Sequence, residues 1–183
     1  MKKFLSVFLL VTLVAAMLFV PVIPAKAKAE NLTVLTAMYP SKGYYHEELW
    51  IGNPIMKTIE PSPRDYVDVQ AAAVIIDART YVPMRFVVEN LMPASTAAKA
   101  VTWDAKIKKA TFVRGTHKVE VWIGKSTILV NGVAVILDAP AFITAGRTMM
   151  PLRAISEGLG AFVNWDATDG KGRVDIFASR TIS

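Results

Sequence analysis

The chain has 183 residues, of which 21 are basic and 15 acidic, and it contains no cysteine. Without cysteine, a disulfide framework, a thiol nucleophile and a lipid-modified cysteine anchor are excluded. The first 29 residues contain four lysines and no acidic residue, so residues 30–183 contain 17 basic and 15 acidic residues. This net charge of +2 argues against a nucleic-acid or anionic-membrane partner.

The first 29 residues have the pattern of a secretory signal peptide. Lys2 and Lys3 precede an uncharged apolar run over residues 4–20, and small residues follow at two sites, so cleavage is expected after Ala27 or Ala29. The alternative is an uncleaved anchor, for which 17 apolar residues are marginal. We therefore expect a secreted or cell-surface protein with no membrane segment after cleavage.

Residues 30–47 are expected to form an extended lead, and the domain itself is predicted to span residues 48–183. The lead carries Tyr39, Tyr44 and Tyr45 and is a candidate for an added edge strand. No apolar run after residue 30 is long enough to cross a bilayer.

Within the domain, one pattern occurs twice. Residues 79–91 align without a gap to residues 147–159, and six of the 13 positions are identical. Trp-Asp-Ala then recurs at 103–105 and 165–167, and Trp-Ile-Gly recurs at 50–52 and 122–124. Such self-similarity predicts a tandem internal repeat, with units at about 48–119 and 120–178.

Each unit is predicted to contain one short helix. Pro83 and Pro151 suit a first helical turn, where a missing N–H costs nothing. Helical spacing then gives one apolar stripe per helix, formed by Met84, Val87, Val88 and Leu91 in the first unit and by Leu152, Ile155 and Leu159 in the second. Pro93 is expected to stop the first helix, and Gly160 to end the second in a left-handed conformation.

Short β-prone segments surround the helices. Asn131-Gly132, between two apolar runs, predicts a two-residue hairpin. Val119, Val121 and Ile123 alternate with Glu120 and Trp122, as in a half-buried strand. The order of elements predicts an α+β fold that is mostly antiparallel sheet with two short helices.

The duplicated Pro-x-Arg, with Glu four residues after each Arg, and the recurring Trp-Asp-Ala resemble the copper amine oxidase N-terminal-like domain, or stalk domain, of secreted Gram-positive proteins. The resemblance covers residues 49–178. It implies a non-catalytic appendage, because copper and the tyrosine-derived quinone of the oxidases belong to a separate catalytic domain. The first unit departs from the family pattern: it has a six-residue insertion, lacks the helix-ending glycine, and has residues 60–70 in place of the Asn-Gly hairpin.

The sequence offers no recognisable catalytic residues, metal site or cofactor motif. A copper site needs several imidazoles, whereas His46 and His117 lie about 70 residues apart and are expected to face solvent. Ser156 has no plausible base nearby in sequence. Asp166, Asp169 and Asp175 could suggest a calcium loop, but the segment lacks calcium-loop spacing and is interpreted as a turn. The lysines at 106, 108 and 109 are interpreted as a solvated turn.

The repeated charged and aromatic residues are interpreted first as architecture. Arg and Glu four positions apart can pair on a helix face, and a single catalytic centre would not need two copies. The structural repeat motif therefore comprises Pro83, Arg85, Glu89, Trp103, Pro151, Arg153, Glu157 and Trp165. Trp50 and Trp122 are the tentative binding residues, either packed in the sheet or exposed as platforms for sugar rings.

These observations favour a secreted, non-catalytic binding or spacer module of the bacterial cell envelope or extracellular space. The alternative is a carbohydrate- or cell-wall-binding module that uses exposed tryptophans. The partners expected are a cell-wall glycan or another envelope protein.

Overall fold

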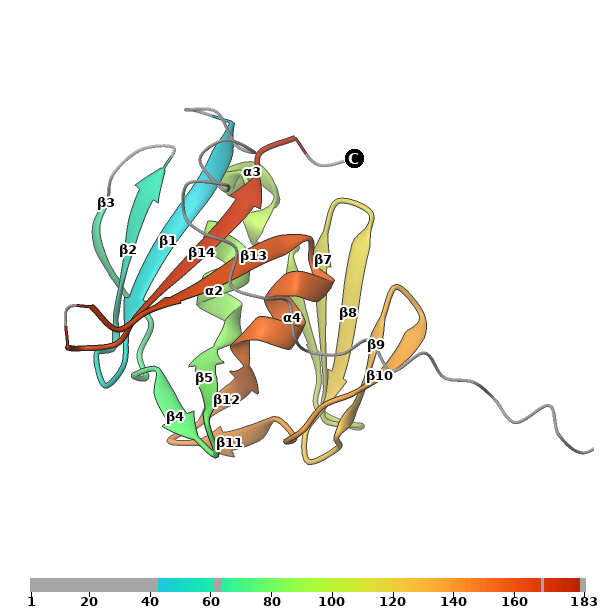
Figure 1. Cartoon of the computed structure of the whole chain (residues 1–183). Helices are drawn as coiled ribbons and strands as arrows, with labels where there is room; N and C mark the ends of the chain where they lie inside the picture. Colours follow the sequence, from blue (N-terminus) through green and yellow to red (C-terminus); the bar gives the residue numbers. More distant parts are fainter. Residues whose placement is uncertain (1–42, 61–63, 169, 182–183) are drawn as a thin grey trace, which may run out of the picture.

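A computed structural model describes residues 43–60, 64–168 and 170–181. The predicted signal peptide, and the lead as far as residue 42, lie outside the described residues. The fold is mostly antiparallel sheet with a few short helices (Figure 1). Within the described part of the chain, no helix has the length and apolar content required to span a membrane.

Three sheets make up the fold, and neighbouring strands in each are antiparallel. The β1 sheet contains, in spatial order, β13 (Ala161–Asp166), β14 (Arg173–Ser179), β1 (Tyr44–Trp50), β2 (Ile55–Glu60) and β3 (Arg64–Asp68). The β8 sheet contains β10 (Val133–Ile136), β9 (Thr127–Val130), β8 (His117–Trp122), β7 (Lys109–Arg114) and β6 (Val101–Asp104). The β5 sheet contains β11 (Phe142–Thr144), β12 (Arg147–Pro151), β5 (Arg79–Pro83) and β4 (Val74–Ile76).

The helices α2 (Met84–Asn90) and α4 (Leu152–Gly158) lie between the two five-stranded sheets, with the β5 sheet below them in Figure 1. Both predicted apolar stripes are confirmed, because every one of their residues is buried in the common core. Burial of this stripe, rather than helix propensity, stabilises helices only two turns long.

Two details of the helices differ from the prediction. Pro83 and Pro151 are the last residues of β5 and β12 and precede the helices, with extended ψ angles of 85° and 111°. Pro93, which was expected only to stop the first helix, also precedes a short helix that was not predicted, α3 (Ala94–Ala97). The Pro93 carbonyl accepts hydrogen bonds from the N–H groups of Thr96 and Ala97, which closes this turn.

The expected edge strand is a central strand. β1 begins at Tyr44, inside the predicted lead, and pairs with β14 on one side and β2 on the other. Its alternation buries Tyr45, Glu47 and Leu49 toward the core. The sequence-based boundary between the units, at residues 119 and 120, falls within β8.

The predicted hairpin at Asn131-Gly132 is confirmed. Both residues have positive φ, 51° and 82°, as a two-residue turn requires, and they join β9 to β10. The predicted alternation in β8 is also confirmed, with Val119 and Val121 fully buried and Trp122 half-buried.

The first half of the described chain (β1 to β7, with α2 and α3) and the second half (β8 to β14, with α4) are interleaved. The β1 sheet joins three strands of the first half to two of the second, the β8 sheet does the reverse, and the β5 sheet takes two from each. Loop hydrogen bonds correspond as well: the Gly52 N–H donates to the Ala73 carbonyl at 2.8 Å, and the Gly124 N–H to the Ala141 carbonyl at 2.9 Å. Each of the three sheets therefore contains strands from both halves.

A single buried arginine connects the ends of both longer helices. Arg114, at the end of β7, is 2% exposed. Its Nε donates to the carbonyl of Leu91 at 3.3 Å, and its Nη1 to the carbonyl of Leu159 at 3.3 Å, while Nη2 donates to the carbonyl of Ser179. Leu91 and Leu159 are the C-cap residues of α2 and α4, so one guanidinium satisfies the carbonyl ends of two helix dipoles.

Candidate ligand-binding groove

The two predicted Arg–Glu pairs are present on their helix faces. Arg85 Nη1 lies 3.3 Å from Glu89 Oε1 on α2, and Arg153 Nη1 lies 3.5 Å from Glu157 Oε1 on α4. Their surroundings differ, however, because Arg85 also lines a cavity of the protein. Arg85 is therefore a candidate for contact with a ligand as well as for a role in the scaffold.

The tryptophans with the largest exposed fractions are not the pair chosen from the sequence. Trp103 is 41% exposed and Trp165 is 40% exposed, whereas Trp50 and Trp122 are half-buried. Trp122 lies under Lys109, whose Nζ is 5.6 Å from the ring centroid. Trp50 borders a shallow hollow with Ile51, Gly52, Asn53 and Lys171.

The position of Trp103 explains why alternation failed to identify it. Trp103 shares a strand face with Val101, which is buried, so period-2 alternation places the indole inside. β6, however, is an edge strand of the β8 sheet, and the burial along it decreases from Val101 toward its end. The indole thus lies beyond the part of that face that the core covers.

A cavity of about 420 Å³ opens beside Trp103, between the start of α2, the β6–β7 edge of the β8 sheet and the β11–β12 hairpin. We call it the Trp103 groove. Its lining comprises Gln70, Pro83, Arg85, Phe86, Val101, Thr102, Trp103, Ala110, Phe112, Ile143, Gly146, Arg147, Thr148 and Met150. Its size lies within the range of about 300–1,000 Å³ typical of small-molecule sites.

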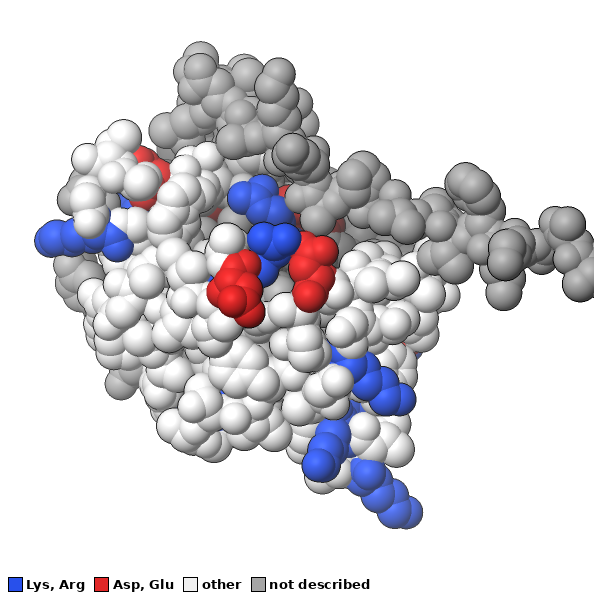
Figure 2. All heavy atoms as spheres, turned by 60° about the horizontal axis from the view of Figure 1, so that its bottom comes forward, with Lys and Arg blue, Asp and Glu red and all other residues white. Residues whose placement is uncertain are grey.

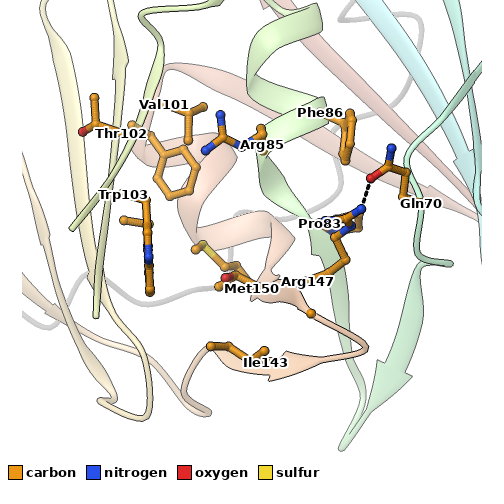
Figure 3. A pocket seen from close by; sticks show the side chains of 14 residues that line it. Gln70, Pro83, Arg85, Phe86, Val101, Thr102, Trp103, Ile143, Arg147 and Met150 are labelled. Atoms are coloured by element: carbon orange, nitrogen blue, oxygen red, sulfur yellow. Dashed lines mark hydrogen bonds between the residues drawn. The ribbon is translucent and has the colours of Figure 1, made fainter. Parts of the chain in front are cut away.

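The side chains of the groove converge from separate elements. Figure 3 shows Trp103 on one side and Arg147 with Gln70 on the opposite side, with Met150 between them. Arg147 Nη2 donates a hydrogen bond to Gln70 Oε1, which fixes the guanidinium at the groove wall. Arg147 is the first residue of β12, so the turn that closes the β11–β12 hairpin positions it.

The groove has the chemistry of a recognition site. Its lining combines aromatic and aliphatic surface with two guanidinium groups, an amide and the hydroxyls of Thr102 and Thr148. Among these lining residues, all of them described, there is no carboxylate, imidazole, thiol or serine hydroxyl to act as a general base or nucleophile. The arrangement is suited to hold a ligand by stacking and hydrogen bonding.

A second polar cluster lies on the β1 sheet and corrects the expectation for His46. The ring is half-buried, stacks on Phe177 with centroids 4.2 Å apart, and lies with Nε2 3.0 Å from Asp175 Oδ1. His46 does not face solvent freely, because β1 is central in its sheet and Phe177 on β14 covers the ring. His117 on the β8 sheet is also half-buried, beside Gly160.

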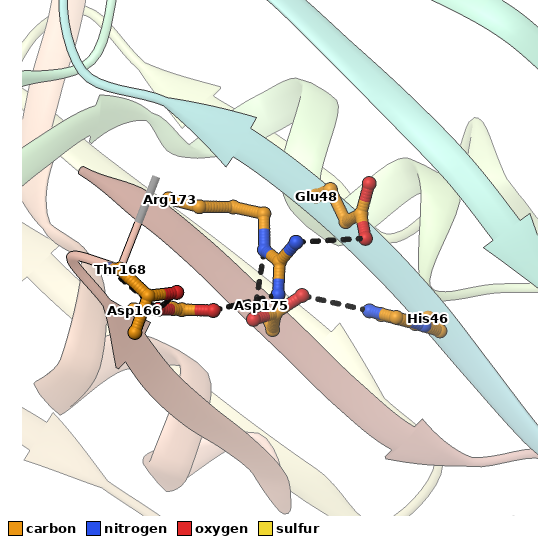
Figure 4. Close-up of polar contacts among 6 residues, drawn as sticks. All are labelled: His46, Glu48, Asp166, Thr168, Arg173 and Asp175. Atoms are coloured by element: carbon orange, nitrogen blue, oxygen red, sulfur yellow. Dashed lines mark hydrogen bonds and ion pairs between the residues drawn. The ribbon is translucent and has the colours of Figure 1, made fainter. Parts of the chain in front are cut away.

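His46, Glu48 and Asp175 are the described residues whose ligand atoms approach closely enough to hold a metal ion, within 4.8 Å of one another. The Arg173 guanidinium already occupies this cluster, as Figure 4 shows. It lies 3.3 Å from Asp175, 4.0 Å from Glu48 and 2.9 Å from Asp166. This cluster does not fit a copper centre, because the Arg173 guanidinium lies among its carboxylates and His46 is its single imidazole.

The corresponding strands of the β8 sheet carry a similar ion pair. Lys109 and Glu120 hold the positions on β7 and β8 that Arg173 and Glu48 hold on β14 and β1, and their charged atoms are 2.9 Å apart. A hydrogen bond from Lys109, with a further one from Lys118, lowers the pKa of Glu120. Cross-strand pairs of this kind stabilise a sheet face and account for the Arg173 cluster without a ligand.

Of the remaining polar residues singled out in the sequence, Asp166 forms turn contacts and Ser156 is buried in the core. Asp166 accepts a hydrogen bond from the Thr168 N–H at 2.8 Å, and bonds from Thr168 lower the pKa of this carboxyl. This part of the predicted turn is confirmed, while Asp169 lies outside the described residues. Ser156 is fully buried on α4, and its Oγ has no hydrogen-bond partner in the described structure.

The surface charge is localised. Figure 2 shows one face on which a small group of acidic and basic side chains lies apart from a basic group near one edge, with uncharged surface between them. The predicted lysine turn is confirmed for Lys106 and Lys108, which are exposed in the β6–β7 turn, but it is wrong for Lys109, which begins β7 and pairs with Glu120.

The fold is therefore an antiparallel β module with short helices and one candidate binding groove beside Trp103. The chain belongs to the copper amine oxidase N-terminal domain family, whose model matches residues 62–173. In copper amine oxidases this domain is a non-catalytic module. No curated protein and no solved structure matches the chain.

Proposed function

We propose that the chain is a secreted, non-catalytic binding module of the bacterial cell envelope or extracellular space. The observation that carries this proposal is the Trp103 groove, which combines an exposed indole with two arginines, an amide and hydroxyls and no acid–base pair among its lining residues. The non-catalytic character of the family's domain supports the same assignment. Export is inferred from the signal-peptide pattern of residues 1–29, which lie outside the described residues.

We also propose that the two halves arose by duplication of one strand–helix–strand unit, as the sequence pattern indicates. The support is the matched order of elements, the matched loop hydrogen bonds and the shared Arg–Glu pairs. Residues that serve the scaffold recur in both halves under this proposal. A ligand site is then sought where the halves differ, and the Trp103 groove is such a place.

The second candidate function is carbohydrate binding through tryptophan, and the exposure of Trp103 favours it. An indole face packs against the C–H face of a sugar ring, and nearby amide, hydroxyl and guanidinium groups bind the sugar hydroxyls. Trp103 replaces Trp50 and Trp122 as the preferred platform, since those two are half-buried.

The experiment is cosedimentation of residues 30–183, which include every described residue, with purified Gram-positive cell walls. The proposal expects saturable binding to the walls and no hydrogen peroxide from amines in the presence of copper. Amine oxidation at a rate above that of copper alone would contradict the non-catalytic assignment. Absence of binding to walls and to extracted envelope proteins would contradict the binding assignment.

A further inference from the structure

We propose that the Trp103 groove binds an acidic glycan, a sugar chain that bears carboxylate or phosphate groups. The inference rests on the proposed binding function and specifies its ligand. The groove is lined by Arg85 and Arg147 and by no acidic side chain, so its formal charge is positive, whereas residues 30–183 together carry a net charge of only +2. A ligand of complementary charge is therefore favoured.

Arginine at both places suits an oxyanion. A guanidinium presents five N–H donors in a planar fork that matches the geometry of carboxylate and phosphate. Arg147 donates one hydrogen bond to Gln70, which fixes its guanidinium in place. The Arg85 side chain is 50% exposed, and its contact with Glu89 is long, at 3.3 Å. Both arginines therefore retain donors for a ligand.

The remaining lining residues suit a sugar ring rather than a small anion. Trp103 offers a flat, exposed apolar face at one side, and Phe86 and Met150 continue the apolar surface (Figure 3). Thr102 and Thr148 supply hydroxyls at the same groove. Inorganic phosphate would use only the hydrogen-bond donors of the groove. A monosaccharide unit with a charged substituent would use the donors and the stacking surface together.

The second half of the chain provides matched controls. Trp165 corresponds to Trp103 in sequence and is exposed to the same extent, 40% against 41%. Arg153 corresponds to Arg85 and makes the same bond to a glutamate. Arg79 corresponds to Arg147, but its side chain pairs with Asp138 on the surface. Neither Trp165, Arg153 nor Arg79 lines the Trp103 groove.

The test is calorimetric titration of residues 30–183 with oligogalacturonate, its neutral methyl ester, a phosphorylated mannose oligomer and oligoglutamate. We expect binding to the carboxylated sugar, the phosphorylated sugar or both, which distinguishes the two sources of charge, and at least about tenfold weaker binding to the ester. Trp103→Ala and Arg147→Met should each weaken binding about tenfold or more, while Trp165→Ala and Arg153→Met stay within about twofold.

Equal affinity for the methyl ester, equal affinity for oligoglutamate, or unchanged binding by Trp103→Ala and Arg147→Met would each overturn the proposal. Failure to bind all four probes would overturn it too. If the same two variants still sediment with cell walls as the unmodified chain does, the binding function stands and only the acidic-glycan groove falls. Circular dichroism of each variant verifies that a loss of affinity is not a loss of fold.

Discussion

Arg114 shows how one side chain can matter more to the fold than any repeated motif. The sequence pattern drew attention to the repeated arginines on the helices, whereas Arg114, which has no counterpart in that pattern, binds the carbonyl ends of both helices. The position that corresponds to it on β14 is Ala178, which is fully buried. One arginine therefore serves both halves, and a pattern that searches for repeated residues overlooks it.

Replacement of Arg114 by methionine should destabilise the protein by about 3–5 kcal/mol, because three carbonyls would lose a buried charged donor. Urea unfolding followed by circular dichroism measures the loss. Lys106→Met, at an exposed side chain of the β6–β7 turn, is the control and should change the free energy of unfolding by less than about 0.5 kcal/mol. A small effect of Arg114→Met would show that the helix ends do not depend on it.

The ionised side chains of Glu120 and Glu157 should affect the stability of the fold in opposite directions. Hydrogen bonds from Lys109 and Lys118 lower the pKa of Glu120, so its stabilisation is present above the unfolded value of 4.5 and is lost as pH falls through the folded value. Burial raises the pKa of Glu157 despite Arg153, so its carboxylate destabilises the fold at neutral pH, and this penalty disappears as pH falls.

Glu120→Gln should therefore lower Tm at pH 7, and Glu157→Gln should raise it slightly. Thermal melts between pH 3 and pH 8 provide the measurement. Both differences from the unmodified chain should shrink as pH falls below about 4.5. Shifts of the same sign for the two variants at pH 7 would contradict the assigned environments.

At the scale of elements, the sequence was informative wherever local chemistry decides conformation. The Asn131-Gly132 hairpin and both apolar helix stripes follow from residue type and period alone. α3 was missed because its four residues depend on the Pro93 carbonyl, a local cap without an apolar stripe. The central place of β1 was missed because its pairing with β14 joins residues more than 120 positions apart.

The end of α4 depends on Gly160 for two reasons. Its φ of +72° is strained for other residues, and a Cβ there would lie 3.0 Å from Nε2 of His117. Gly160→Ala should therefore cost more than the roughly 1–2 kcal/mol of the backbone strain alone. Gly132→Ala has the same strain, with no atom within 4 Å of the added Cβ, and should cost less in chemical denaturation. Equal losses would show that the His117 contact gives way freely.

At the scale of the whole molecule, interleaving makes the two halves interdependent. Each five-stranded sheet needs strands from both halves, so neither should fold alone. The urea transitions of the two sheets should coincide when a single tryptophan is kept in each, Trp165 for the β1 sheet and Trp122 for the β8 sheet, with phenylalanine at the other positions. Two separated midpoints would indicate independent lobes and contradict this architecture.

The candidate site illustrates the limit of sequence reasoning at this scale. On the sequence alone, Arg85 and Trp103 belong to the structural repeat motif, and Trp50 and Trp122 are the chosen binding residues. The sequence could not place Arg85 and Trp103 at one cavity, because the groove also requires Gln70 and Arg147 from distant segments. Trp103 differs from Trp165 because residues of the other half of the chain, such as Arg147, line a groove beside Trp103, whereas Trp165 does not line it. The proposed binding function therefore depends on a difference between the two halves.

Amide chemical-shift changes, mapped while ¹⁵N-labelled residues 30–183 are titrated with oligogalacturonate and with the phosphorylated mannose oligomer, test the Trp103 groove most directly. Saturable changes should concentrate on Gln70, Arg85, Trp103 and Arg147, and residues around Trp165 should be unaffected. Changes centred on Trp50 and Lys171, equal changes at Trp103 and Trp165, or no saturable change with either oligomer would contradict the proposed groove.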